Sequence, residues 1–124
     1  MTSLMTTRKT TVNWTDSETE LLLTTIKHYK YNSIALGYDW TGLRERYDKI
    51  RDNFISSYQQ LPHGCDGFPN KDNLAIFSKT IVVNKIKRLR SGFREIIQSK
   101  GKYLGHYPRF VKLNLARTFH NILN

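Results

Sequence analysis

Residues 78–99 read SKTIVVNKIKRLRSGFREIIQS, and this stretch carries the clearest periodicity in the chain. Its apolar residues recur at steps of four, three, four and three, at Val82, Ile86, Leu89, Phe93 and Ile96. This spacing places them on one face of an α-helix, and Gly101 can end such a helix. We therefore predict an amphipathic helix that begins near Ser78 or Thr80 and ends near Ser99.

The opposite side of this predicted helix is polar and cationic. It carries Asn84, Arg88 and Ser91, with Lys85 and Lys87 on the flanks, and it has no acid before Glu95. Asparagine pairs with adenine and arginine with guanine in the major groove, so we predict a DNA-reading surface here. A solvated basic face is the simpler alternative. The candidate DNA contacts are Lys79, Thr80, Asn84, Lys85, Lys87, Arg88, Ser91 and Arg94.

The distribution of charge supports a polyanionic partner. The chain has 124 residues and a formal net charge of +10. Residues 78–124 hold eleven Lys/Arg and one acid, whereas residues 1–77 hold nine of each sign. The whole excess therefore lies in the C-terminal part, where each phosphate that is neutralised would release condensed counterions.

A first helix is predicted upstream. Thr15-Asp16-Ser17-Glu18 has the spacing of a capping box, in which a hydroxyl and a carboxylate each satisfy a backbone amide. An apolar stripe of Leu22, Leu23, Ile26 and Tyr29 follows and runs to about Tyr31. We expect the stop to lie between Asn32 and Gly37.

A second helix should begin after Asp39. Its apolar stripe consists of Trp40, Leu43, Tyr47, Ile50, Phe54 and Tyr58, and its polar side of Arg44, Glu45, Asp48, Arg51 and Asp52. The charges on this side largely cancel, which indicates a scaffold helix. Residues 59–77 contain two prolines and two glycines and form a long connection, with Leu74, Ile76 and Phe77 able to pin its end to the core.

An amphipathic C-terminal helix completes the predicted all-α fold. It follows a hinge at residues 101–108, and its apolar face consists of Phe110, Val111, Leu115, Phe119 and Ile122. We expect residues 1–11 to be a flexible N-terminal arm and residues 12–124 to be one domain. No run approaches the roughly 18–20 apolar residues that span a bilayer, so we predict a soluble intracellular protein without a membrane partner.

Catalytic and metal-binding motifs are not recognisable in the sequence. Cys65 is the only cysteine, and His63-x-Cys65 has no second pair at zinc spacing. The sequence also lacks a Ser/His/Asp set, paired carboxylates in a pocket-like context, and a Gly-rich phosphate loop followed by Lys-Ser/Thr. We therefore predict no catalytic residue, no metal and no cofactor.

The chain resembles the Myb/SANT-like helix-turn-helix superfamily, particularly its trihelix and MADF-like branch. The matching elements are Trp14-Thr15-Asp16 followed by Glu18 and Leu21-Leu22-Leu23, Asp39-Trp40 at the second helix, and residues 84–89 leading to Phe93. The resemblance covers roughly residues 12–123 as a pattern. It implies a three-helix bundle with a fourth helix appended, and core positions at Trp14, Trp40 and Ile86.

The resemblance also implies a function. Family members place the third helix in the major groove, and base-reading positions carry over to Asn84 and Lys87. Ile86 replaces the usual tryptophan, Val83 stands where Myb repeats often have lysine, and the 59–77 insertion replaces a short turn. The implied protein binds double-stranded DNA in the nucleus and regulates transcription or chromatin.

Two other functions remain open at this stage. One is a SANT-type protein-interaction subunit or homodimer that uses the C-terminal helix or residues 59–77. The other is weakly specific binding of RNA or DNA by charge alone. Specific duplex binding would leave a component that resists competitor DNA, whereas charge-only binding falls steeply with salt.

Overall fold

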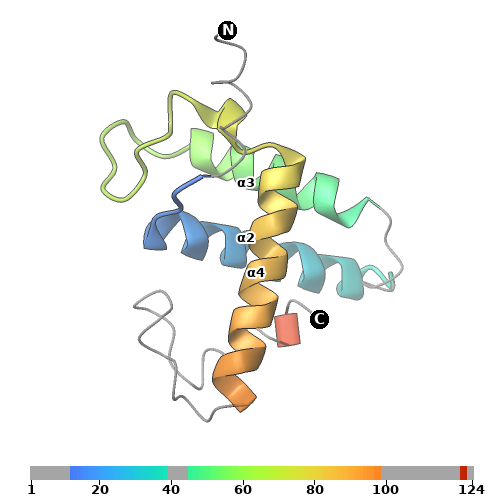
Figure 1. The fold of residues 1–124 in the computed structure, drawn as a ribbon. Coiled ribbons are helices and arrows are strands. Elements are labelled where there is room, and N and C mark those ends of the chain that lie inside the picture. Colours follow the sequence, from blue (N-terminus) through green and yellow to red (C-terminus); the bar gives the residue numbers. More distant parts are fainter. Residues whose placement is uncertain (1–11, 39–44, 99–120, 123–124) are drawn as a thin grey trace, which may run out of the picture.

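The computed structural model describes residues 12–38, 45–98 and 121–122, and every regular element in these ranges is helical (Figure 1). The elements are α2 (Asp16–Ala35), α3 (Arg46–Gln59), the 3-10 turn η2 (Leu74–Ile76) and α4 (Lys79–Gln98). The predicted all-α class is confirmed. The N-terminal arm, Trp40 and the 101–108 hinge lie outside the described residues.

The helices α2 and α3 run side by side in opposite directions, and α4 crosses them (Figure 1). One hydrophobic core joins all three, because residues of α2 (Leu22, Leu23, Ile26), α3 (Ile50, Phe54, Tyr58) and α4 (Val82, Ile86, Leu89, Phe93) belong to the same buried cluster. Beyond the point of crossing, the C-terminal part of α4 extends past α2 in this view.

The predicted capping box opens α2. The Thr15 hydroxyl accepts a hydrogen bond from the Glu18 amide at 3.0 Å, and the Glu18 carboxylate accepts one from the Thr15 amide at 3.0 Å. The helix continues one turn past Tyr31 and ends at Ala35, within the predicted stop region. The helix ends in a Schellman motif. The Gly37 amide donates a hydrogen bond to the Ile34 carbonyl, and the Tyr38 amide donates one to the Ser33 carbonyl. Gly37 has φ +87°, which favours glycine there.

The apolar stripe of α3 is confirmed for its described residues, but the helix begins at Arg46, with Glu45 at the N-cap position, and not directly after Asp39 as predicted. Ile50, Phe54 and Tyr58 are almost completely buried, and Tyr47 is half-buried. Asp39, Trp40 and Leu43 lie outside the description. One position on the polar side differs from the prediction: Arg51 is half-buried, and its Nε donates a hydrogen bond to the Phe77 carbonyl at 2.9 Å.

Aromatic rings fill the centre of the core. The ring of Phe77 lies 5.1 Å from that of Phe54 and 4.9 Å from that of Trp14, measured between centroids. Phe77 is fully buried, whereas Leu74 and Ile76 are partly buried against the core. The end of the long connection is therefore pinned as predicted, and chiefly by Phe77.

A buried polar network fixes the rest of this connection. The Glu18 carboxylate accepts hydrogen bonds from the Tyr58 hydroxyl at 2.6 Å and from the Asn70 side-chain amide at 2.8 Å. The Tyr58 hydroxyl in turn accepts one from the Asn70 backbone amide, and the Thr15 hydroxyl donates one to the Gly67 carbonyl. Burial and the hydrogen bond to Glu18 raise the pKa of the Tyr58 hydroxyl. These hydrogen bonds attach the middle of the connection to α2 and α3.

Of the predicted C-terminal helix, only Asn121 and Ile122 are described. Both are helical, and Ile122 is buried in the core cluster, as its apolar character predicts. The Lys30 ammonium donates hydrogen bonds to the carbonyls of Asn121 at 2.7 Å and Ile122 at 3.2 Å. These contacts attach the segment to α2.

Replacing Tyr58 with phenylalanine tests the buried network. Tyr58→Phe removes one donor to Glu18 and the acceptor of the Asn70 amide, so we expect the free energy of unfolding to fall by about 1–3 kcal/mol in urea titrations followed by circular dichroism. The control Tyr31→Phe changes an exposed tyrosine, and we expect an effect within about 0.5 kcal/mol. Equal effects of the two changes would contradict the role of the network.

Two glycines of the connection allow a matched comparison. Gly64 and Gly67 both have positive φ, but a Cβ on Gly67 would lie 2.3 Å from Ser17 Oγ, whereas one on Gly64 would meet nothing within 4 Å. We expect Gly64→Ala to cost roughly 1–2 kcal/mol from backbone strain, and Gly67→Ala to cost about 1–3 kcal/mol more. The same urea titration measures both, and equal losses would show that residue 67 does not pack on α2.

Candidate nucleic-acid interface

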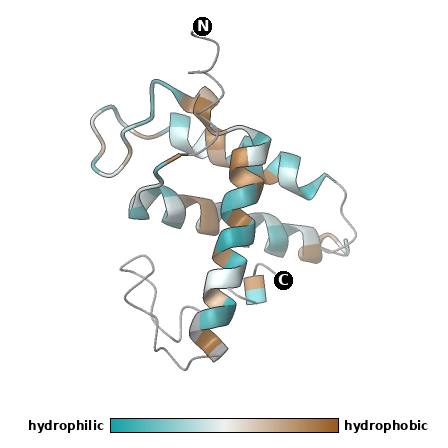
Figure 2. Ribbon diagram, viewed as in Figure 1, coloured by the Kyte–Doolittle hydropathy of each residue, from teal (hydrophilic) through white to brown (hydrophobic). Residues whose placement is uncertain are grey.

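The helix α4 is divided into an apolar face and a polar face. Val82, Ile86, Leu89 and Phe93 are 6% exposed or less, as their spacing predicts, and Ile81 and Gly92 are buried beside them. Hydrophilic segments alternate with hydrophobic ones along the visible ribbon of α4, as Figure 2 shows. Burial of the apolar face against the core leaves the other face of α4 turned outward.

Seven of the eight predicted contact residues are exposed. These are Lys79, Thr80, Asn84, Lys87, Arg88, Ser91 and Arg94. Five of them follow one another at steps of three or four residues and so form one stripe along the helix: Thr80, Asn84, Lys87, Ser91 and Arg94. We call this stripe, together with Arg88 on its edge, the outer face of α4.

Lys85 does not share this placement. It is half-buried, and its ammonium lies 5.7 Å from the centroid of the Trp14 ring, within the range of a cation–π contact. Burial lowers its pKa, and the nearby charge of Arg88 acts in the same direction, whereas Asp16 opposes it. The structure therefore assigns Lys85 to the packing of α4 on Trp14 and separates it from the outer face.

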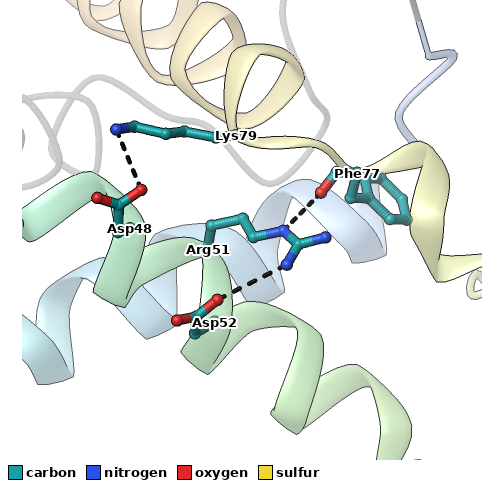
Figure 3. Close-up of polar contacts among 5 residues, drawn as sticks. All are labelled: Asp48, Arg51, Asp52, Phe77 and Lys79. Carbon is teal, nitrogen blue, oxygen red and sulfur yellow. Dashed lines mark hydrogen bonds and ion pairs between the residues drawn. The ribbon is translucent and has the colours of Figure 1, made fainter.

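Lys79 is exposed but paired. Its ammonium lies 3.0 Å from the carboxylate of Asp48, and Figure 3 shows this contact beside the hydrogen bond from Arg51 to the Phe77 carbonyl. Both side chains of the pair are about half exposed, 55% for Lys79 and 51% for Asp48. A surface ion pair contributes about 0–1 kcal/mol, so Lys79 can exchange Asp48 for a phosphate at little cost.

A second cationic group, which the sequence did not reveal, lies where α3 meets α4. The hydroxyl of Tyr47 accepts hydrogen bonds from Arg90 Nη2 at 3.3 Å and from Arg46 Nη2 at 3.4 Å. The guanidinium of Arg46 also lies 4.9 Å from the centroid of the Tyr47 ring. Burial alone would raise the pKa of this hydroxyl, but the two guanidinium groups outweigh it and lower the pKa.

Other types of site have little support among the described residues. No group of three or more His, Cys, Asp and Glu side chains in this part of the chain could hold a metal ion. His63 and Asp72 form an exposed contact of 3.9 Å, and Cys65 is half-buried beside them. Within the same ranges, no helix is both long enough and apolar enough to cross a membrane.

Paired substitutions distinguish the packing lysine from a lysine of the outer face. Lys85→Ala removes the side chain that covers Trp14, so we expect a loss of about 1 kcal/mol in the free energy of unfolding. Lys87→Ala removes the same charge from an exposed position and should change stability by less than about 0.5 kcal/mol. Urea titration monitored by circular dichroism measures both. A larger loss for Lys87→Ala would reverse the assignment.

The chain was also compared with known proteins. No protein-family model, no curated protein and no solved structure matches it. The resemblance to Myb/SANT-like domains therefore stays a prediction, and the proposals that follow rest on the residues of this chain.

Proposed function

We propose that this protein binds duplex DNA by placing the outer face of α4 in the major groove, and that it regulates transcription or chromatin in the nucleus. The observation that carries the proposal is the outer face itself. It presents amide, hydroxyl and cationic groups to solvent over several turns of a helix whose other face is anchored in the core. An α-helix fits the major groove, which is about 12 Å wide.

The residue types on the outer face suit separate tasks. The Asn84 amide can pair with adenine, and Arg88 can pair with the O6 and N7 atoms of guanine. Lys87 can reach guanine or a phosphate. Thr80, Ser91 and Arg94 lie at the ends of the stripe and suit the phosphate backbone, whose contacts set the position of the helix without reading sequence. Such a division would make binding both strong and selective.

The contrast between the helices favours nucleic acid over a merely soluble surface. Helix α4 carries six Lys/Arg and one acid, whereas α3 carries three Lys/Arg and two acids and α2 carries two Lys and three acids. Solubility would not require cations to collect on one helix. Segregation of this kind is the electrostatic footprint expected of a nucleic-acid-binding domain.

A Myb/SANT-like arrangement agrees with this proposal. In such an arrangement α2, α3 and α4 would be the three bundle helices, with α4 as the reading helix. The resemblance implies core roles for Trp14, Trp40 and Ile86. The burial of Ile86 and the packing of the half-buried Trp14 against the core support this part of the proposal. Trp40, at the other position, is not among the described residues.

A second candidate function is a protein-interaction module, and one surface favours it. The C-terminal end of α2 and the turn after it expose Tyr31 and Ile34 at 51%, Leu36 at 75% and Tyr38 at 58%. Large apolar side chains gathered at one place often mark a contact with another protein. This surface differs from the outer face of α4, so both functions could coexist.

Substitutions on the outer face test the DNA proposal. We expect the chain to select a sequence motif from a random pool of duplexes, and Asn84→Ala and Lys87→Ala each to cost about 1–3 kcal/mol of binding free energy on the selected duplex. Specificity should relax because base contacts are lost. Fluorescence anisotropy with competitor DNA at several salt concentrations measures both effects.

The control for this experiment is Lys27→Ala, which removes an exposed cation of α2. If it weakens binding as much as Asn84→Ala and Lys87→Ala, then the chain binds by overall charge and the reading role of α4 is wrong. If neither change on the outer face affects binding to any duplex, the protein-interaction function is favoured.

A further inference from the structure

An acid from α3 lies at the start of the cationic helix. Lys79 is the first residue of α4, and its ammonium lies 3.0 Å from the carboxylate of Asp48, in the first turn of α3 (Figure 3). Thr80, the next residue, is the first member of the stripe on the outer face. The packing of the two helices therefore brings a negative charge to the end of α4 at which the outer face begins.

The pairing sets Lys79 apart from the other exposed cations of α4. Lys87, Arg88 and Arg94 are exposed as well, but they form no ion pair with any acid among the residues that the structure describes. Only the cation at the helix start is thus neutralised from within the chain, as far as the description extends.

The start of α4 is a place that favours an anion. The positive end of the helix dipole lies there, and the first turn of α4 has no acid of its own. An ammonium and a helix N-terminus are together the surroundings in which proteins hold phosphate groups. Asp48 supplies the anion in this structure, so its carboxylate stands where a phosphate oxygen would be favoured.

A carboxylate and a phosphate compete for Lys79. Both side chains of the pair are about half exposed, so water screens their attraction and the contact is easily broken. When Lys79 turns to a phosphate, Asp48 stays nearby, and two anions beside one ammonium repel each other. A duplex therefore has to displace Asp48 before it gains the full contact with Lys79.

We propose that Asp48 is an internal competitor of DNA: it holds the place of one backbone phosphate at Lys79, and duplex binding exchanges the carboxylate for that phosphate. This inference rests on the proposed function and adds a residue of α3, outside the outer face, that limits the affinity. Asp48 touches no base in this proposal. It acts through Lys79 and lowers the affinity for every duplex that uses this lysine.

Replacing Asp48 with asparagine tests the competitor by a gain of binding. Asp48→Asn keeps the size of the side chain and removes its charge. On the duplex selected by the full chain, we expect about fivefold tighter binding at about 0.1 M salt, measured by fluorescence anisotropy. The gain should shrink as salt is raised to about 0.5 M, because the ion pair that it removes is exposed and already screened there.

The control Asp52→Asn makes the same change of charge on the same helix. Asp52 is 66% exposed, and its carboxylate lies 3.6 Å from Arg51 of its own helix. No cation of α4 is released by this change, so we expect binding to tighten by less than about twofold. The difference between the two variants measures the effect of Asp48 beyond net charge.

A double-mutant cycle then links the gain to Lys79. Lys79→Gln alone should weaken binding and reduce the slope of log K against log salt by about 0.9, the value for one phosphate. In the Lys79→Gln background, Asp48→Asn should do no more than Asp52→Asn does. Thermal unfolding checks each fold, and a loss of fold would weaken binding, opposite to the expected gain. If Asp48→Asn does not fold, Asp48→Ser is measured in its place.

The remaining outcomes separate this inference from the proposed function. If Asp48→Asn tightens binding no more than Asp52→Asn, or keeps its whole gain without Lys79, the internal competitor is refuted while duplex binding stands. If the wild-type chain binds no duplex above the level of charge-only binding, the proposed function fails and the competitor fails with it.

Discussion

The carboxylate of Glu18 is the group on which the arrangement of this fold depends. It is completely buried, and it accepts hydrogen bonds from the Thr15 amide, the Tyr58 hydroxyl and the Asn70 side chain. A buried carboxylate without such partners would cost several kcal/mol, so these groups must meet in one geometry. The Glu18 carboxylate thereby joins three segments: the start of α2, the end of α3 and the middle of the connection.

This junction determines how α4 is presented. Asn70 is hydrogen-bonded to Tyr58 and Glu18. Farther along the connection, the Phe77 ring packs against Trp14 and Phe54. The Phe77 carbonyl accepts a hydrogen bond from Arg51. Helix α4 begins two residues later, at Lys79. The apolar face of α4 covers the core. Because the cationic face lies on the opposite side of the helix, it points outward. The orientation of the outer face is therefore a consequence of packing.

The cations of the chain serve different purposes, and only their surroundings distinguish them. Lys85 covers Trp14, Arg51 holds the Phe77 carbonyl, and Arg90 contacts Tyr47 of α3. Lys87, Arg88 and Arg94 are exposed on or beside the stripe that contains Asn84. The first group links elements of the fold, whereas the second is available for a partner. This division is what the proposed contact between the outer face of α4 and a polyanionic partner requires.

Periodicity and local chemistry by themselves determined the all-α class and the capping box at Thr15. They also determined the buried stripes of α2, α3 and α4 and the exposure of Asn84, Lys87 and Arg88. Such features depend on residues that are three or four positions apart. Only the tertiary structure decided that Lys85 faces Trp14, that Glu18 organises the 59–77 connection, and that Arg46, Tyr47 and Arg90 meet. These contacts join residues that are up to 71 positions apart, as for Trp14 and Lys85. Sequence spacing carries no information about them, because they arise from the way in which separate helices pack.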